Sequence, residues 1–179
     1  MKQPSTQRVS APRLLVVMGV SACGKSSFGA AMAARLGVAF VDGDDLHPRH
    51  NIDKMRAGLA LDDADRLPWL DAIGAALADR QAHPQGLVLA CSALKRAYRA
   101  RIRAGAAGLR FIFLDIDEAT AARRCAARPD HFMPASLVAS QFAALERPLD
   151  DEPDVLTIPA TLALAAAVDL AASRLAGAD

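Results

Sequence analysis

The sequence is poor in cysteine pairs and in long apolar runs. Its 179 residues hold three cysteines, Cys23, Cys91 and Cys125, which lie far apart and form no CxxC pair. This pattern favours a reducing compartment over a disulfide framework. The polar N-terminal stretch lacks the apolar core of a signal peptide, and no window approaches the roughly 18 apolar residues of a membrane span. We therefore expect a cytoplasmic protein that has no membrane partner.

Excess charge of one sign is also absent. The chain has 21 basic and 20 acidic residues and a formal net charge of +1, whereas a general nucleic-acid binder presents a broad positive field. No nucleic-acid partner is expected. Lysine is scarce, with Lys2, Lys25, Lys54 and Lys95 as its only occurrences. Because an ammonium and a guanidinium are not interchangeable, the last three lysines are candidates for functional positions.

What is present is an alternation of short apolar runs with helical segments. The apolar runs are Leu14–Met18, Val38–Val41, Leu87–Cys91, Phe111–Leu114 and Val155–Ile158. The helical segments are Lys25–Leu36, Pro48–Ala57, Asp63–Arg80, Lys95–Arg103, Glu118–Ala126, Ala135–Leu145 and Thr161–Leu175. Strands separated by helices predict right-handed βαβ units and a parallel sheet covered on both faces. The expected fold class is α/β, with a five-stranded parallel sheet flanked by helices.

Length and composition predict how this chain is divided. At 179 residues and 53% hydrophobic content, it is long enough for one domain with a substantial core. We expect a flexible tail over residues 1–12 and a single domain over 13–179. The segment from Asp63 begins with acidic residues, and helical spacing predicts a buried stripe, formed by Leu67, Leu70, Ile73 and Leu77.

The strongest motif is the segment GVSACGKS, residues 19–26. It matches GxxxxGK[ST] in full and lies between a predicted strand and a predicted helix, as a P-loop requires. Its backbone N–H groups and the helix N-terminus suit a phosphate chain. Lys25 is expected to reach the β- and γ-phosphates of ATP, and the Ser26 hydroxyl to bind Mg²⁺. The predicted nucleotide-binding residues here are Gly19, Ser21, Ala22, Cys23, Gly24, Lys25, Ser26 and Ser27.

Other P-loop classes find less support. The only DxxG match, residues 71–74, falls inside a predicted helix, and no [NT]KxD signature occurs, which disfavours a GTPase. Ser92 stands where many P-loop proteins carry a Walker B aspartate, which disfavours a motor or transporter. Within the loop, Lys25 and nearby amides could activate the Cys23 thiol. We favour the other interpretation, a small side chain tolerated in a tight loop.

Carboxylates follow the second predicted strand in the run Asp42-Gly43-Asp44-Asp45. Loops at the carboxyl ends of parallel strands face the ligand crevice. Asp42 is expected to hold Mg²⁺ through a water, and Asp44 to orient the attacking hydroxyl and accept its proton. Asp45 is interpreted as a helix cap.

Basic side chains around the same crevice predict an anionic acceptor, since a carboxylate gains from charged hydrogen-bond donors. The candidates are His47, Arg49, Lys54, Arg66, Lys95 and Arg96, and Ser92 is added to the predicted substrate-binding set. Lys54, Arg66 and Lys95 are the preferred ligands of a carboxylate and hydroxyls, with His47 as a hydroxyl partner. Trp69 is interpreted as core packing. Three further basic residues are interpreted as part of a solvated helix face: Arg99, Arg101 and Arg103.

Three blocks together resemble the small gluconokinase family. They are MGVSACGKS at 18–26, DGDDLHPRHNIDKMRAGLALDDADRLPWL at 42–70, and CSALKRAYR at 91–99. The resemblance extends over nearly the whole chain from about residue 13. It implies that ATP and Mg²⁺ phosphorylate the 6-hydroxyl of D-gluconate, that the fold resembles shikimate kinase and nucleoside monophosphate kinases, and that the protein is a homodimer. Similarity to shikimate kinase also supports the roles given to Asp42 and Asp44.

The resemblance implies further elements. An acceptor-binding insertion is expected over about residues 44–80, and a lid over about 123–134 in which Arg124 and Arg128 contact ATP phosphates. Pro159 is expected to wall the adenine. Two alternatives stay open: another small-acceptor P-loop kinase, such as a shikimate-like enzyme, and an NTP-binding regulatory module.

Overall fold

The computed structural model describes residues 14–81, 85–127 and 136–177. Five parallel strands form one sheet in the order β2-β3-β1-β4-β5. The strands are β1 (Leu14–Met18), β2 (Ala39–Asp42), β3 (Leu87–Ala90), β4 (Arg110–Asp115) and β5 (Val155–Pro159). The predicted α/β class and its five-stranded parallel sheet are confirmed. The tail expected over residues 1–12 lies outside the described residues.

The helices follow the predicted segments closely. They are α1 (Lys25–Leu36), the 3-10 helix η1 (Gly43–Leu46), α2 (Arg49–Arg56), α3 (Asp63–Gln81), α4 (Arg96–Gly105), α5 (Glu118–Ala126), α6 (Ser136–Ala144) and α7 (Leu164–Ala176). The expectation that the last helix begins at Thr161 is wrong, because Ala163, its N-cap, has a non-helical ψ of 142°. None of the helices in the described ranges is both long and apolar enough to span a bilayer.

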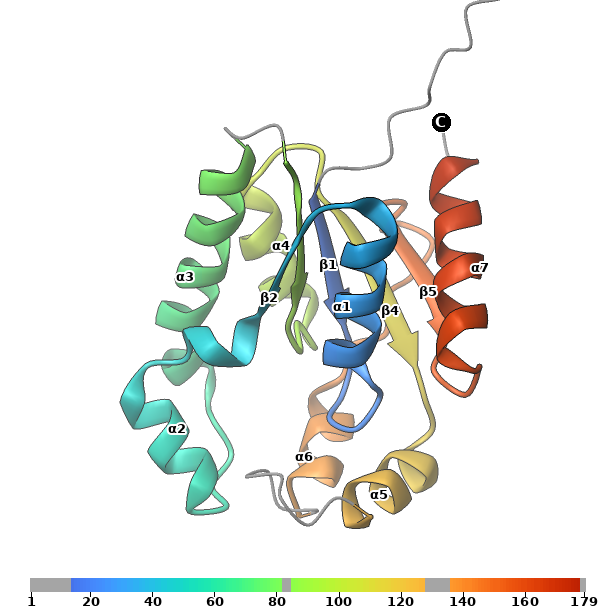
Figure 1. Cartoon of the computed structure of the whole chain (residues 1–179). Helices are drawn as coiled ribbons and strands as arrows, with labels where there is room; N and C mark the ends of the chain where they lie inside the picture. Colours follow the sequence, from blue (N-terminus) through green and yellow to red (C-terminus); the bar gives the residue numbers. More distant parts are fainter. Residues whose placement is uncertain (1–13, 82–84, 128–135, 178–179) are drawn as a thin grey trace, which may run out of the picture.

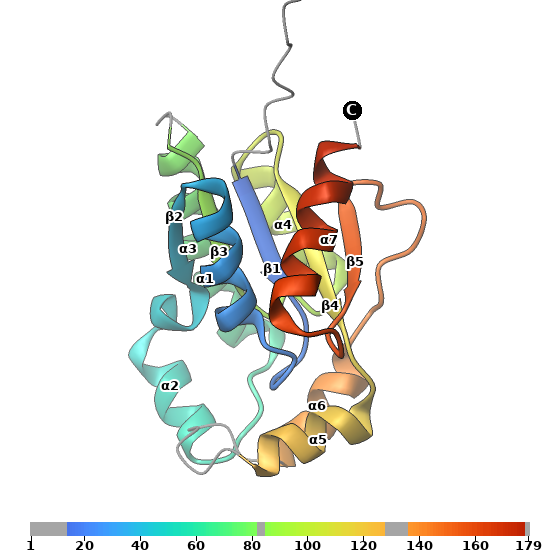
Figure 2. The ribbon, with the colours of Figure 1, turned by 45° about the vertical axis from the view of Figure 1, so that its right-hand side comes forward.

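Helices cover both faces of the sheet, with α1 and α7 on one side and α3 and α4 on the other (Figures 1 and 2). The central strand β1 shows why. Its alternate side chains point to opposite faces, so Leu15 and Val17 belong to the core with α1 and α7, while Leu14, Val16 and Met18 belong to the core with α3 and α4. All five β1 residues are buried, which explains their continuous apolar run.

Helix α3 buries most of its predicted stripe. Leu70, Ile73 and Leu77 are buried as expected, but Leu67 is 41% exposed, so that part of the prediction is wrong. Close packing against α4 depends on glycine: a Cβ added at Gly105 would lie 2.8 Å from the Cα of Gly74. Larger residues at that contact would push the two helices apart.

The arginines of helix α4 are where the interpretation from sequence is most clearly wrong. Arg99 is 1% exposed and pairs with the buried Glu152 at 2.5 Å, so it does not lie on a solvated face. Arg103 also turns inward and pairs with Glu152 at 2.7 Å and Asp154 at 2.6 Å. Arg101 does face outward, where it pairs with Asp71. The segment that precedes β5 covers this side of α4 and supplies the acidic partners.

The strands run in one direction, so their carboxyl ends share one edge of the sheet. The loop after β1, the η1–α2 segment after β2, and the helices α5 and α6 gather at this edge, in the lower part of Figure 1. The segments singled out from sequence therefore meet where a ligand of a parallel α/β fold is expected.

Candidate active site

The loop between β1 and α1 has the backbone conformation of an anion cradle. Gly19 and Gly24 have φ values of 145° and 96°, and Ala22 also has a positive φ of 63°. A Cβ at Gly19 would lie 2.9 Å from the carbonyl oxygen of Leu114, so glycine is required there. Gly24 precedes α1 without a side-chain cap, which leaves the first N–H groups of the helix available to phosphate oxygens. Lys25 Nζ donates to the carbonyl of Val20 at 3.0 Å.

The end of β2 is connected to this cradle. Ser26 Oγ donates to Asp42 Oδ2 at 2.6 Å, and Asp42 Oδ1 accepts from the N–H of Asp44 at 3.1 Å. Hydroxyl and carboxylate oxygens are ligands that suit Mg²⁺, which is commonly held by one or two protein groups together with substrate phosphates and water. The described ranges contain no cluster of three or more histidine, cysteine or acidic side chains able to hold a metal. The Ser26–Asp42 pair thus fits a metal shared with a nucleotide.

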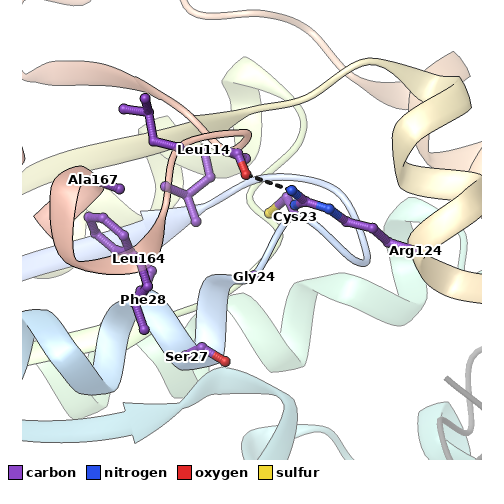
Figure 3. Close-up of a pocket in the computed structure, with 10 residues that line it drawn as sticks. Cys23, Gly24, Ser27, Phe28, Leu114, Arg124, Leu164 and Ala167 are labelled. Atoms are coloured by element: carbon purple, nitrogen blue, oxygen red, sulfur yellow. Dashed lines mark hydrogen bonds between the residues drawn. The ribbon is translucent and has the colours of Figure 1, made fainter. Parts of the chain in front are cut away.

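A cavity of about 190 Å³ lies on one side of the cradle (Figure 3). Its walls come from the loop itself, α1, β4, α5, the segment after β5, and α7. The residues are Cys23, Gly24, Ser27, Phe28, Leu114, Arg124, Ala160, Leu162, Leu164 and Ala167. Arg124 Nη2 donates to the carbonyl of Ala160 at 3.0 Å. Pro159 is not part of the lining, although Ala160 beside it is.

Cys23 lies in the wall of this cavity but only 3% of it is exposed. Burial raises the pKa of its thiol, and the nearby positive charge of Lys25 only partly opposes this effect. A hypothetical Cβ at Gly19 would lie 2.9 Å from the Cys23 sulfur, which shows how tightly the loop closes around it. The interpretation as a small buried side chain agrees with this environment better than that of an activated thiol.

A second, smaller cavity of about 40 Å³ has Lys25 in its lining. It is lined by Ser21, Lys25, Asp44, His47, Met55, Leu61, Arg66, Trp69, Ser92 and Gln141. Six of these were singled out from sequence as site residues: Ser21, Lys25, Asp44, His47, Arg66 and Ser92. The structure therefore brings the cradle lysine, a carboxylate and two of the basic candidates into one cavity.

Other basic candidates lie outside that lining, each in an ion pair. Arg49 is 82% exposed and pairs with Asp53 on the same helix. Lys54 Nζ lies 2.5 Å from Asp65, and Lys95 Nζ lies 2.6 Å from Asp63. The hydrogen bond that each ammonium donates to its carboxylate partner raises the pKa of the lysine, so both ammonium groups stay charged. Arg96 pairs with Asp151, away from the cavity lining.

His47 is held against an aromatic wall. Its imidazole stacks on the Trp69 indole at 4.3 Å between ring centroids and an angle of 11°. Trp69 Nε1 donates to the carbonyl of Gly43 at 2.7 Å, which fixes the indole. Burial, with the Arg66 charge as a second cause, lowers the pKa of His47 to about 4. The burial predicted for Trp69 is confirmed, but its contact with His47 was not anticipated.

Gln141 of α6 is a site residue that sequence reasoning missed. Its Oε1 accepts from the Ser21 N–H at 2.6 Å, and its Nε2 donates to Ser21 Oγ at 2.9 Å. Because Gln141 also lines the second cavity, it joins the cradle to that cavity. A single neutral amide outside any motif gives no signal in one sequence. Of the expected lid, Arg128 and residues 128–134 lie outside the described residues.

Comparisons with known proteins agree on one group. A family model described as an AAA domain matches residues 14–149. A gluconokinase of Gluconobacter oxydans is 46% identical, and the match covers 86% of each chain. The crystal structure of a gluconokinase from Sinorhizobium meliloti is 45% identical, covers 93% of each chain and superposes with a TM-score of 0.82. Shikimate kinase from Aquifex aeolicus shares the fold, with a TM-score of 0.59 at 15% identity, over 92% of this chain and 96% of its own.

Proposed function

Because this chain belongs to the gluconokinase family, we propose that the two cavities beside the P-loop are the nucleotide site and the acceptor site of one phosphotransferase. The enzyme transfers the γ-phosphoryl group of ATP to the 6-hydroxyl of D-gluconate and produces 6-phospho-D-gluconate. The observation that carries this assignment is the meeting of Lys25 and Asp44 in one cavity next to the cradle. We call the cavity of about 190 Å³ the nucleotide cavity and that of about 40 Å³ the acceptor cavity.

The nucleotide cavity suits adenosine. Its apolar walls, among them Phe28, Leu114 and Leu164, provide contact area for a base, and its lining includes Cys23 and Gly24 of the cradle that would hold the phosphates. Arg124 reaches the same cavity from α5 and would pair with phosphate oxygens. Pro159 remains a proposed neighbour of the adenine through its position beside Ala160.

The acceptor cavity suits a small polyhydroxy acid. Arg66 supplies a guanidinium for the carboxylate, while His47 and Ser92 supply hydrogen bonds to hydroxyl groups. Lys54 and Lys95 remain proposed ligands, but each would have to exchange its present partner, Asp65 or Asp63, for the acceptor.

Arg49 remains the weakest of the proposed ligands, since it points to solvent. The segment of about residues 44–80, which carries most of these groups, is proposed to be the acceptor-binding insertion of a single domain over residues 13–179. Six of the ten lining residues come from this segment, which supports the proposal; they are Asp44, His47, Met55, Leu61, Arg66 and Trp69.

The chemistry follows from what these side chains can do. Asp44 would accept the proton of the attacking hydroxyl and hold that oxygen in line with the terminal phosphorus, a role typically worth about 10²–10⁴ in rate. Lys25 would stabilise the negative charge of the transferring phosphoryl group. Ser26, and Asp42 through a water, would hold Mg²⁺, which when bound neutralises charge on the phosphate oxygens.

We also propose a cytoplasmic homodimer. The three cysteines are free and buried, which agrees with a reducing compartment. The dimer is supported by the family resemblance.

A coupled assay of ADP release tests the proposed function. The purified chain is supplied with MgATP and, in separate reactions, with D-gluconate, related sugar acids, shikimate, a nucleoside monophosphate, or no acceptor. Turnover that depends on D-gluconate supports the proposal. Turnover with shikimate or a nucleotide instead would assign a different acceptor, and release of ADP that is independent of any acceptor would indicate a regulatory NTP-binding module.

A further inference from the structure

Behind the acceptor cavity lies a side chain that has no assigned role, Asn51 of α2. It is completely buried, with 0% of its surface exposed. Its Nδ2 lies 2.8 Å from the carbonyl oxygen of Asp65 and 3.3 Å from Nδ1 of His47. Asn51 does not line the cavity itself. Of the two hydrogen-bond partners of its side chain, only His47 lines the cavity, so His47 is the direct route by which Asn51 can influence an acceptor.

The carbonyl of Asp65 determines how the Asn51 amide is oriented. A backbone carbonyl oxygen can only accept a hydrogen bond, so the amide atom at 2.8 Å from it must be the nitrogen. The reversed amide would bring two acceptor oxygens together without a hydrogen between them. Nδ2 has two hydrogens, so the second one is available for a hydrogen bond to His47 Nδ1, which lies 3.3 Å away. Nδ1 must then be the acceptor of that bond.

An imidazole whose Nδ1 accepts a hydrogen bond is neutral and carries its hydrogen on Nε2. The charged groups that share the cavity with His47 are Lys25, Asp44 and Arg66. Burial and the Arg66 charge both disfavour the imidazolium and lower the pKa of His47 to about 4. The stack on Trp69 restrains the plane of the ring. Nε2–H is therefore the polar group of the ring that remains available to a molecule in the cavity.

The other end of the Asn51 amide shows that this arrangement has a cost. Oδ1 is buried and has no hydrogen-bond partner in the described part of the chain. A buried acceptor without a partner lowers stability, and a leucine of similar size would avoid that penalty. The position thus retains a polar side chain whose evident benefit is the pair of hydrogen bonds made by Nδ2.

We propose that Asn51 is a positioning residue that locks His47 in its Nε2–H tautomer, so that the imidazole offers a neutral hydrogen-bond donor to an oxygen of the acceptor molecule. This inference rests on the assignment of the acceptor cavity under the proposed function. It adds a rule of specificity. At the His47 contact the enzyme selects a group that accepts a hydrogen bond, a hydroxyl or carboxylate oxygen, and disfavours an ammonium group, which only donates.

The tautomer can be observed without any acceptor. The full chain has four histidines, so a long-range ¹H–¹⁵N spectrum of the labelled protein at pH 7 can be assigned with His47→Gln. We expect the Nε2–H pattern for His47, unchanged down to about pH 5 because its pKa is about 4. His50, exposed on α2, is the matched control and should show ordinary tautomer exchange. An Nδ1–H pattern, an imidazolium at pH 7, or exchange averaging like that of His50 would overturn the proposal.

Kinetics then test what the tautomer does. Asn51→Leu should lose the Nε2–H pattern and raise the KM for gluconate about 10-fold, the effect of one lost hydrogen bond to a charged or polar partner, with the KM for ATP unchanged. His47→Gln, which places an amide nitrogen near the former Nε2, should retain a lower gluconate KM than His47→Asn. An unchanged gluconate KM in Asn51→Leu would contradict the proposal, as would equal values for the two His47 variants.

The two experiments separate this inference from the function on which it rests. The spectrum of the unaltered protein remains decisive if Asn51→Leu does not fold. If gluconate is not phosphorylated at all, the proposed function fails whatever the tautomer. If gluconate is phosphorylated and His47 carries its hydrogen on Nδ1, only the role of Asn51 fails. His50→Gln should leave both KM values at the level of the unaltered enzyme.

Discussion

Ser26 donates from its hydroxyl to the carboxylate of Asp42 at 2.6 Å. This bond joins the first turn of α1 to the end of β2, which β3 separates in the sheet from β1, the strand that precedes α1. It also links the two halves of the reaction, because Ser26 belongs to the nucleotide cradle and Asp42 is two residues from Asp44. A metal ion bound near Ser26 and Asp42 would therefore be positioned by the nucleotide cradle and by the segment that carries Asp44.

Asp42→Asn should therefore impair the use of Mg²⁺ more than the binding of ATP alone. Removing the negative charge weakens the hold on a metal-bound water, and such changes typically cost about 10–100-fold in metal affinity or activity. The measurement is the Mg²⁺ concentration for half-maximal turnover at saturating ATP and gluconate. Asp53→Asn, on the exposed side of α2, is a matched control. The same Mg²⁺ requirement in Asp42→Asn and in the unaltered enzyme would remove Asp42 from the metal site.

Arg66→Ala should weaken the binding of gluconate without affecting ATP. Its guanidinium lines the acceptor cavity, and loss of a charged hydrogen bond to a carboxylate corresponds to about 1.5–3 kcal/mol, or a rise in KM of roughly 10- to 150-fold. Arg56→Ala, exposed at the end of α2, provides the comparison. Steady-state kinetics with each substrate varied in turn decide the matter. Rescue of Arg66→Ala by ATP instead of gluconate would move this residue to the nucleotide side.

Gln141→Ala should disturb the cradle through Ser21. The variant loses two hydrogen bonds, one at 2.6 Å to the Ser21 N–H and one at 2.9 Å to the Ser21 hydroxyl. We expect kcat to fall about 10-fold, since each neutral bond contributes roughly 0.5–1.5 kcal/mol, while the melting temperature changes little. Gln141→Glu keeps the acceptor for the N–H, and it should retain more activity than the alanine variant. Normal kcat in Gln141→Ala would show that the contact has no catalytic consequence.

The buried pair of Arg99 and Glu152 should contribute more to stability than an exposed ion pair does. Arg99 also donates to the carbonyls of Leu94 and Glu146, so the pair fastens the loop after β3 to the segment before β5. Glu152→Gln leaves a buried guanidinium without its counter-charge and should destabilise the fold by about 3–5 kcal/mol. Arg101→Met, which breaks the exposed pair with Asp71, should cost no more than about 1 kcal/mol. Equal losses in urea denaturation would contradict the assigned difference.

The pH dependence of that pair has a definite sign. Hydrogen bonds from Arg99 and Arg103 lower the pKa of Glu152 from 4.5 to about 2. A carboxyl whose pKa is depressed by folding stabilises the native state fully above its unfolded value, and this contribution disappears as the pH falls toward the folded value. Stability of the unaltered protein should thus decline between about pH 4.5 and 2, and Glu152→Gln should lose this part of the decline.

Local sequence predicted the individual strands, most helices and the cradle because each of these depends on residues that are close together in the chain. The run Leu14–Met18 had to be a buried strand, and the motif that follows it dictates its own turn. Arg99 could not be placed in the same way. Its position on α4 becomes an interior one only because a segment about fifty residues later covers that helix, as the distance to Glu152 in the sequence shows.

The acceptor residues illustrate a second limit. Charge alone made Lys54 and Lys95 as attractive as Arg66, but the acidic partners that occupy the two lysines lie on α3, at Asp65 and Asp63. Whether a basic side chain faces the cavity depends on whether a nearby carboxylate already binds it. Gln141 could not be found at all, because its role depends only on the packing of α6 against the cradle.

The most direct test concerns Asp44, which the mechanism makes the proton acceptor. Asp44→Asn should lower kcat with gluconate by about 10²–10⁴-fold while the Kd for ATP, measured by calorimetry, stays within a few-fold of the unaltered enzyme. Asp45→Asn, the exposed neighbour, should keep nearly full activity. If Asp44→Asn turns over gluconate at the normal rate, the account of this active site is wrong.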